Sequence, residues 1–144
     1  MRRSLSERAF SPNIYSILIP TLPYSVTFKD HLINPRNAGD LADANASAEE
    51  SNPVCGDRLR LSLRVTDERI EVARFLAYGC PPTLVCGSVM TELIQGKSTA
   101  EASRLTRADL LNAIGGLPSR KQHAAALAIE TLRSALGQAA DSKQ

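Results

Sequence analysis

The sequence predicts an α+β domain in which a strand hairpin is followed by a series of helices. Strict alternation of leucine or valine with polar residues over 59–65 indicates a half-buried strand. A short turn leads to a second run of strand-forming residues at 70–78, so the two runs form an antiparallel hairpin. Helix start and stop signals then follow to the end of the chain. Strands that precede helices in this way are typical of the α+β class.

The composition is that of one globular domain. The chain has 144 residues, of which 43% are hydrophobic and 22% are charged. A net charge of +2 with scattered basic residues, and an aromatic content of 4%, argue against a nucleic-acid partner. Three cysteines are few for a secreted disulfide scaffold, which favours a reducing compartment, the cytoplasm. The apolar run Ile17-Leu18-Ile19 stops at Pro20, so we expect a soluble protein without a membrane span.

The first part of the chain is expected to contain little regular structure. Residues 1–22 lack strand or helix periodicity and are expected to form a flexible extension before a domain at 23–138 and a flexible tail at 139–144. The spacing of apolar residues from Val26 predicts a short helix that ends before Pro35. The small polar segment 37–52 is compatible with either an edge strand or a loop.

The second half of the chain is expected to be helical. After two prolines, the pattern predicts a helix over 83–95 that ends at Gly96. Three capping signals predict the starts of further helices: Ser98 with Glu101, Thr106 with Asp109, and Ser119 with Gln122. The last helix should pack its apolar face on the sheet, and that face holds Ala125, Ile129, Leu132 and Leu136.

Four possible metal ligands lie at the ends of these predicted elements: Cys55, Asp57, Cys80 and His123. In a hairpin the start of one strand lies beside the end of the next, so Cys55 and Asp57 should approach Cys80. Gly56 permits the unusual backbone angles that would aim both neighbouring side chains at one point. Each residue also has an ordinary interpretation, since a single cysteine is often a small buried apolar residue and His123 could be exposed in its helix.

Cys86 is a weaker candidate. It falls inside the helix predicted over 83–95, about 240° around the axis from Cys80, so it should not face the site. If that helix begins late, Cys86 becomes a possible substitute ligand.

Five segments occur in an order that resembles the NifU-like, IscU-type family of iron–sulfur cluster assembly scaffolds, from about residue 24 to residue 136. They are Asn34-Pro35-Arg36-Asn37, Asn52-Pro53-Val54-Cys55-Gly56-Asp57, Gly79-Cys80, Thr91-Glu92-Leu93-Ile94-Gln95-Gly96-Lys97, and Leu117-Pro118 through His123. The resemblance implies an IscU/SufE-like fold, a three-stranded antiparallel sheet with helices packed on it. It also implies a binding protein, not an enzyme, that builds a [2Fe–2S] cluster from iron and from sulfur supplied by a cysteine desulfurase. The cluster then passes to apo-proteins.

The family site implied by this resemblance holds three cysteines, an aspartate, and a histidine just before the third cysteine. Carried over to this chain, it gives Cys55, Asp57, Cys80 and His123, with Ala124 in place of the third cysteine. Two thiolates, one imidazole and one carboxylate suit zinc or a single iron ion at least as well as a cluster. A homodimer could complete a four-cysteine shell around a shared cluster. The alternatives to a scaffold are persulfide transfer and a degenerate zinc-binding relative that regulates a desulfurase.

Overall fold

Three strands form one antiparallel sheet in the order β1-β2-β3 in the structure, a computed structural model that describes residues 23–142. The elements are α3 (Val26–Ile33), β1 (Ala46–Ser51), β2 (Arg58–Thr66), β3 (Arg69–Tyr78), α4 (Pro81–Ile94), α5 (Thr99–Ser103), α6 (Arg107–Ile114), a 3₁₀ turn η2 (Ser119–Lys121) and α7 (His123–Ser142). The extension expected at 1–22 lies outside the described residues. The predicted α+β class and three-stranded sheet are confirmed.

The sheet is amphipathic because the side chains of each strand alternate between its two faces. Leu59, Leu61 and Leu63 of β2 are fully buried on one face, whereas the arginines between and beside them lie on the other face. Strand β1 pairs with β2 along its whole length. The sequence left segment 37–52 open between an edge strand and a loop. Part of it, β1, is an edge strand that is held by its backbone pairing with β2.

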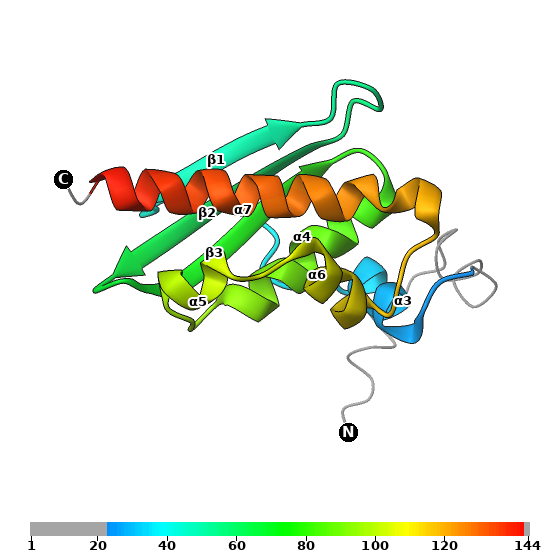
Figure 1. Ribbon diagram of the computed structural model, residues 1–144, viewed down its shortest axis with the longest axis horizontal. Helices are drawn as coiled ribbons and strands as arrows, with labels where there is room; N and C mark the ends of the chain where they lie inside the picture. Colours follow the sequence, from blue (N-terminus) through cyan, green and yellow to red (C-terminus); the bar gives the residue numbers. More distant parts are fainter. Residues whose placement is uncertain (1–22, 143–144) are drawn as a thin grey trace, which may run out of the picture.

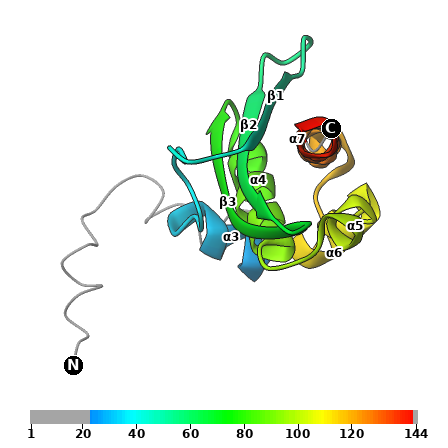
Figure 2. The same ribbon diagram turned by 90° about the vertical axis from the view of Figure 1, so that its left-hand side faces the viewer.

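The helices cover one face of the sheet (Figures 1 and 2). Helix α7 packs on β1 and β2, and α4 packs on β3 and on α7. The connection from α3 to β1 crosses the opposite side of the sheet (Figure 2), where Asp40 and Asp43 pair with Arg60 and Arg64. The expected apolar face of α7 lies against the sheet, with Ala125, Ile129 and Leu132 buried and Leu136 partly buried.

The observed helix starts agree with the starts predicted from the sequence for two helices and differ for two others. The capping boxes of α5 and α6 form as predicted. The cap predicted from Ser119 is wrong, because 119–121 forms a separate 3₁₀ turn and the Gln122 side chain donates to the Leu117 carbonyl. Helix α4 begins at Pro81, two residues before the predicted start, since the first-turn N–H groups that proline lacks have no intrahelical partner anyway.

The end of α7 also differs from the expected boundary. The helix continues to Ser142, and Ala139 is buried. Residues 139–142, expected in a flexible tail, therefore extend the domain. None of the helices within 23–142 has both the length and the hydropathy that spanning a membrane requires.

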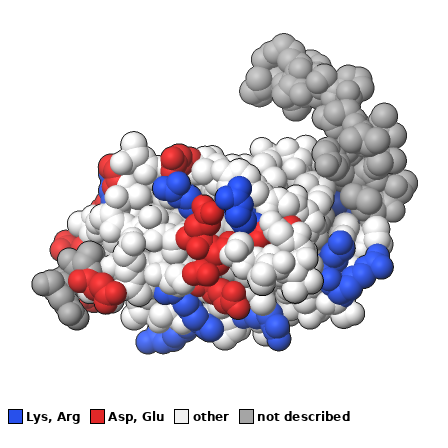
Figure 3. All heavy atoms as spheres, turned by 90° about the horizontal axis from the view of Figure 1, so that it is seen from above, with Lys and Arg blue, Asp and Glu red and all other residues white. Residues whose placement is uncertain are grey.

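Charges of both signs share the surface. On the face shown in Figure 3, a band of acidic side chains lies between groups of basic ones. Several pairs of opposite charge lie on the sheet, among them Arg58 with Glu49 at 3.2 Å and Arg64 with Glu71 at 3.2 Å. Most of these pairs are exposed, and each contributes little to stability in water.

Candidate metal centre

The connection between β1 and β2 forms a closed loop that presents Cys55. Asn52 Oδ1 accepts a hydrogen bond from the Val54 N–H at 2.9 Å, and the Asn52 carbonyl accepts from the Gly56 N–H at 2.8 Å. Gly56 has φ of +80°, a left-handed conformation that favours glycine. These local bonds hold the Cys55 side chain at the surface and direct Asp57 toward the interior.

The end of β3 brings Cys80 to the same place. The strand register pairs Arg58 with Tyr78, so the residues after Tyr78 lie beside Asp57. Gly79 adopts φ of +137°, and a Cβ atom at this position would lie 2.0 Å from Asp57 Oδ1. Only glycine leaves room for the carboxylate here.

Asp57 is the centre of the hydrogen-bond network, and only 3% of its surface is exposed. Its Oδ1 accepts from the Cys80 N–H at 3.1 Å, and its Oδ2 accepts from the Thr83 hydroxyl at 2.9 Å and the Cys80 thiol at 3.1 Å. Burial raises the pKa of Asp57, but the hydrogen bonds from Cys80 and Thr83 outweigh it, so the pKa lies below its usual value. Asp57 is therefore a carboxylate at neutral pH. Burial, followed by the bond to Asp57, raises the pKa of the Cys80 thiol.

His123, the first residue of α7, completes the site from the far end of the chain. Its Nδ1 lies 3.2 Å from the Arg120 carbonyl, which can only accept, so Nδ1 carries the proton in the neutral ring. The other nitrogen, Nε2, is buried, has no hydrogen-bond partner, and lies 3.5 Å from Asp57 Oδ2. A lone pair this close to a carboxylate oxygen is stabilised by a cation between them, either a proton or a metal ion.

The structure brings the predicted residues together. The ligand atoms of Cys55, Asp57 and His123 all lie within 4.8 Å of one another. Cys80 adjoins this group through Asp57, at the 3.1 Å distance between its sulfur and Oδ2. Sulfur, imidazole nitrogen and carboxylate oxygen are donors that zinc and iron accept, so the residues fit a metal ion of this kind. Ala124 follows His123, is fully buried, and offers no ligand atom.

Cys86 lies apart from this group. It is fully buried in the core, and burial raises its pKa to about 12. Helix α4 begins earlier than predicted, not later, so the late start that would have turned Cys86 toward the site does not occur. Its position in the core agrees with the prediction from helix geometry.

Thr83 is the residue at the site that sequence reasoning missed. Its hydroxyl contacts Asp57 and lies 3.6 Å from the Cys80 sulfur. One sequence signal could have identified Thr83. It lies three residues after Cys80, and this spacing places both side chains on one side of the first helical turn.

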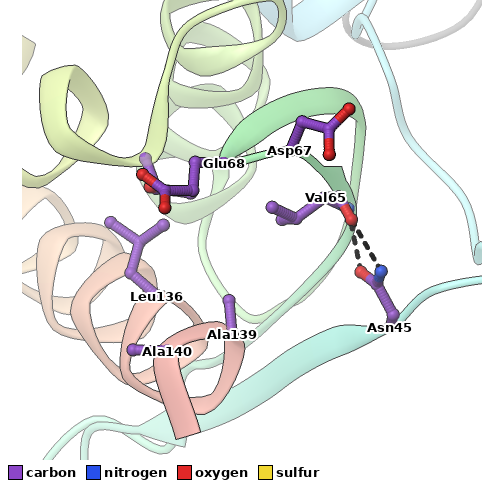
Figure 4. Close-up of a pocket in the computed structure, with 8 residues that line it drawn as sticks. Asn45, Val65, Asp67, Glu68, Leu136, Ala139 and Ala140 are labelled. Atoms are coloured by element: carbon purple, nitrogen blue, oxygen red, sulfur yellow. Dashed lines mark hydrogen bonds between the residues drawn. The ribbon is translucent and has the colours of Figure 1, made fainter. Parts of the chain in front are cut away.

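Two cavities differ in their relation to the centre. A cavity of about 510 Å³ lies near the C-terminal end of α7 (Figure 4) and contains none of the predicted ligands. Its lining consists of Asn45, Val65, Asp67, Glu68, Thr99, Leu136, Ala139 and Ala140. A smaller cavity of about 190 Å³ is lined by His123 and by Asn52 and Pro53 of the β1–β2 loop, so it adjoins the candidate metal centre.

The comparison with family models decides the classification, because the model of the NifU-like N terminal domain matches residues 23–143. The chain belongs to this family. An iron–sulfur cluster assembly scaffold protein, IscU 1 of Archaeoglobus fulgidus, is 41% identical over 113 residues, or 78% of this chain and 74% of the relative. The scaffold protein IscU of Escherichia coli is 38% identical over 119 residues, or 80% of this chain and 92% of the relative.

The fold of the NifU-like domain has a solved counterpart. A crystal structure of a nitrogen-fixing NifU-like protein (N-terminal) from Brucella abortus superimposes with a TM-score of 0.70 at 15% sequence identity. The superposition covers 81% of this chain and 94% of the chain in that crystal structure. At this identity the similarity supports the fold alone.

Proposed function

We propose that this protein is a scaffold or carrier for iron–sulfur cluster assembly, a binding protein and not an enzyme. It binds iron or a [2Fe–2S] cluster through Cys55, Asp57, Cys80 and His123, and passes this cargo to apo-proteins. Relatives named as cluster assembly scaffolds support the role, at 38–41% identity. The three cysteines are free thiols, which suits work in the cytoplasm.

The observation that carries the proposal is the buried lone pair of His123 Nε2, which has no hydrogen-bond partner and faces Asp57 Oδ2 at 3.5 Å. Burying a polar atom without a partner costs free energy, and a bound cation removes that cost. The exposed thiol of Cys55 makes the same site reachable from solvent.

The donor set suits a cargo that is held and then released. Thiolates hold iron and sulfide firmly, whereas a carboxylate is a harder and weaker partner for a cluster. Sulfur would come from a cysteine desulfurase. Two thiolates in one subunit are half of a four-cysteine shell, so a second copy of the chain is the simplest source of the rest.

Anaerobic reconstitution tests the proposal. The purified protein is incubated with iron, cysteine and a desulfurase, and iron, sulfide and zinc are counted per chain beside the visible spectrum. We expect stoichiometric iron and sulfide with a cluster spectrum. Zinc alone, with no sulfide, would contradict a scaffold role.

Two cysteine variants provide a matched comparison. Cys55→Ser removes an exposed thiol of the site, whereas Cys86→Ser makes the same chemical change in the core. We expect the first variant to lose bound iron and the second to keep it at lower fold stability. Loss of iron in Cys86→Ser with an intact fold would instead make Cys86 a ligand.

Persulfide transfer is the second candidate, because Ala124 stands where the resemblance implies a third cysteine while Cys55 is exposed. In such a step the Cys55 thiolate attacks the outer sulfur of a persulfide on a desulfurase. A new S–S bond forms on Cys55, and the desulfurase cysteine leaves as a thiolate, so no other oxidant or reductant is needed. Bound zinc and a persulfide on Cys55, without cluster formation, would favour transfer or regulation of the desulfurase.

A further inference from the structure

Thr83 joins two of the proposed ligands. It lies in the first turn of α4, and its side chain is fully buried. Its hydroxyl oxygen is 2.9 Å from Asp57 Oδ2 and 3.6 Å from Cys80 Sγ. A carboxylate oxygen only accepts hydrogen bonds, so the hydroxyl donates to Asp57. Hydroxyl groups are not among the usual ligands of zinc or of iron–sulfur clusters, so Thr83 contacts the ligands without being one.

Other buried threonines in helices of the described chain use their hydroxyls differently. Thr131 donates to the Leu127 carbonyl at 2.8 Å, and Thr91 donates to the Ser88 carbonyl at 2.9 Å. This bond within the helix is the usual one for a helical threonine. The Thr83 hydroxyl, in contrast, donates across to a loop residue 26 positions away in sequence.

Asp57 Oδ2 accepts from both the Thr83 hydroxyl and the Cys80 thiol, and Oδ1 accepts from the Cys80 N–H. Cys80 is itself one of the proposed ligands. Thr83, in contrast, donates to this carboxylate from outside the proposed ligand set.

We infer that Thr83 is a positioning residue of the metal centre, whose hydroxyl keeps the Asp57 carboxylate directed toward Cys55 and His123. This inference rests on the proposed metal binding of the site. Hydrogen bonds to a ligating carboxylate commonly contribute about 10- to 100-fold to metal affinity.

Zinc affinity of the full chain tests the inference, measured by competition with a chromogenic chelator. Thr83→Val keeps the shape and removes the hydroxyl, and we expect about 10- to 100-fold weaker zinc binding. Thr83→Ser keeps a hydroxyl and should bind within a few-fold of wild type. Thr131→Val is the matched control, since it removes an equally buried hydroxyl from α7, and its affinity should stay at the wild-type value.

A double-mutant cycle separates positioning from a general effect on the fold. If Thr83 acts through Asp57, then Thr83→Val should not weaken zinc binding further in an Asp57→Ala background. Equal weakening in both backgrounds, or wild-type affinity in Thr83→Val, overturns the inference while leaving the metal site in place. A wild-type chain that binds neither zinc nor iron overturns the proposed function and the inference together. If Thr83→Val does not fold, Thr83→Ala against Thr83→Ser gives the same comparison.

Discussion

Asp57 is the one acidic side chain that is buried in the part of the chain that the structure describes. Its charge is tolerated because the Cys80 N–H, the Cys80 thiol and the Thr83 hydroxyl all donate to it. The same bonds aim the carboxylate at His123. Single residues at this site therefore serve the fold and the chemistry at once.

Gly79 offers a test at the residue scale. A Cβ atom in Gly79→Ala would overlap Asp57 Oδ1, so we expect the carboxylate to be displaced and zinc binding to weaken by at least about 10-fold. Gly39→Ala is the control, because Gly39 has a similar φ of +133° but open space around its Cβ position. Both variants should show backbone strain in urea unfolding, whereas only Gly79→Ala should lose zinc affinity in the chelator competition. Equal zinc affinity in the two variants would contradict the steric role of Gly79.

At the scale of elements, a buried polar network fastens α3 to α4. His31 Nε2 faces Glu92 Oε1 at 3.3 Å, and a carboxylate oxygen only accepts, so Nε2 carries the proton in the neutral ring. His31 Nδ1 then accepts from the Ser88 hydroxyl at 2.6 Å, and the Ser88 oxygen accepts from the Arg36 N–H at 2.8 Å. Burial, followed by the charge of Arg36, lowers the pKa of His31 below 6.5, while Glu92 and Asp30 offset part of this effect. His31 therefore joins the two helices as a neutral ring.

This network predicts a pH dependence of stability. Because the pKa of His31 is lower in the folded state, the unfolded chain binds the proton more readily once the pH falls below 6.5. The free energy of unfolding should thus decrease with falling pH from that value down to the folded-state pKa. We expect His31→Asn to lose less stability than wild type between about pH 7.5 and about pH 5 in urea unfolding. Parallel pH curves for the two proteins would exclude His31 as the source.

At the scale of the whole molecule, the proposed metal centre joins segments that are far apart in sequence. The β1–β2 loop supplies Cys55 and Asp57, the junction of β3 and α4 supplies Cys80, and the start of α7 supplies His123. A ligand that binds only this folded arrangement stabilises it by mass action.

Metal should therefore raise the melting temperature of the whole domain. Zinc at about 100 times its dissociation constant stabilises a folded protein by about 2.7 kcal/mol. For a domain of this size that corresponds to a rise of roughly 10 °C in Tm. Thermal unfolding with and without zinc measures it, and Cys55→Ser should reduce the rise. Stoichiometric bound zinc without any change in Tm would show that the unfolded chain binds the ion as tightly as the folded domain does.

Features that depend on neighbouring residues could be predicted from the sequence alone. The hairpin of β2 and β3 follows from period-two alternation around a turn, and the starts of α5 and α6 follow from capping boxes. The candidate ligands followed from motif order and from their positions at element ends. These signals act over a few residues, so they can be read without knowing what lies opposite in space.

Features that depend on contacts between distant segments could be identified only in the folded structure. Segment 46–51 has weak strand propensity and forms a strand because its backbone pairs with β2. The hydrogen bonds of Asp57 with the Thr83 hydroxyl and with the Cys80 N–H join residues more than twenty positions apart, so no local pattern contains them. The shape of the site around Asp57 and its hydrogen-bond partners depend on how the β2–β3 hairpin packs against α4. Because this packing brings distant segments together, these features can be seen only in the folded chain.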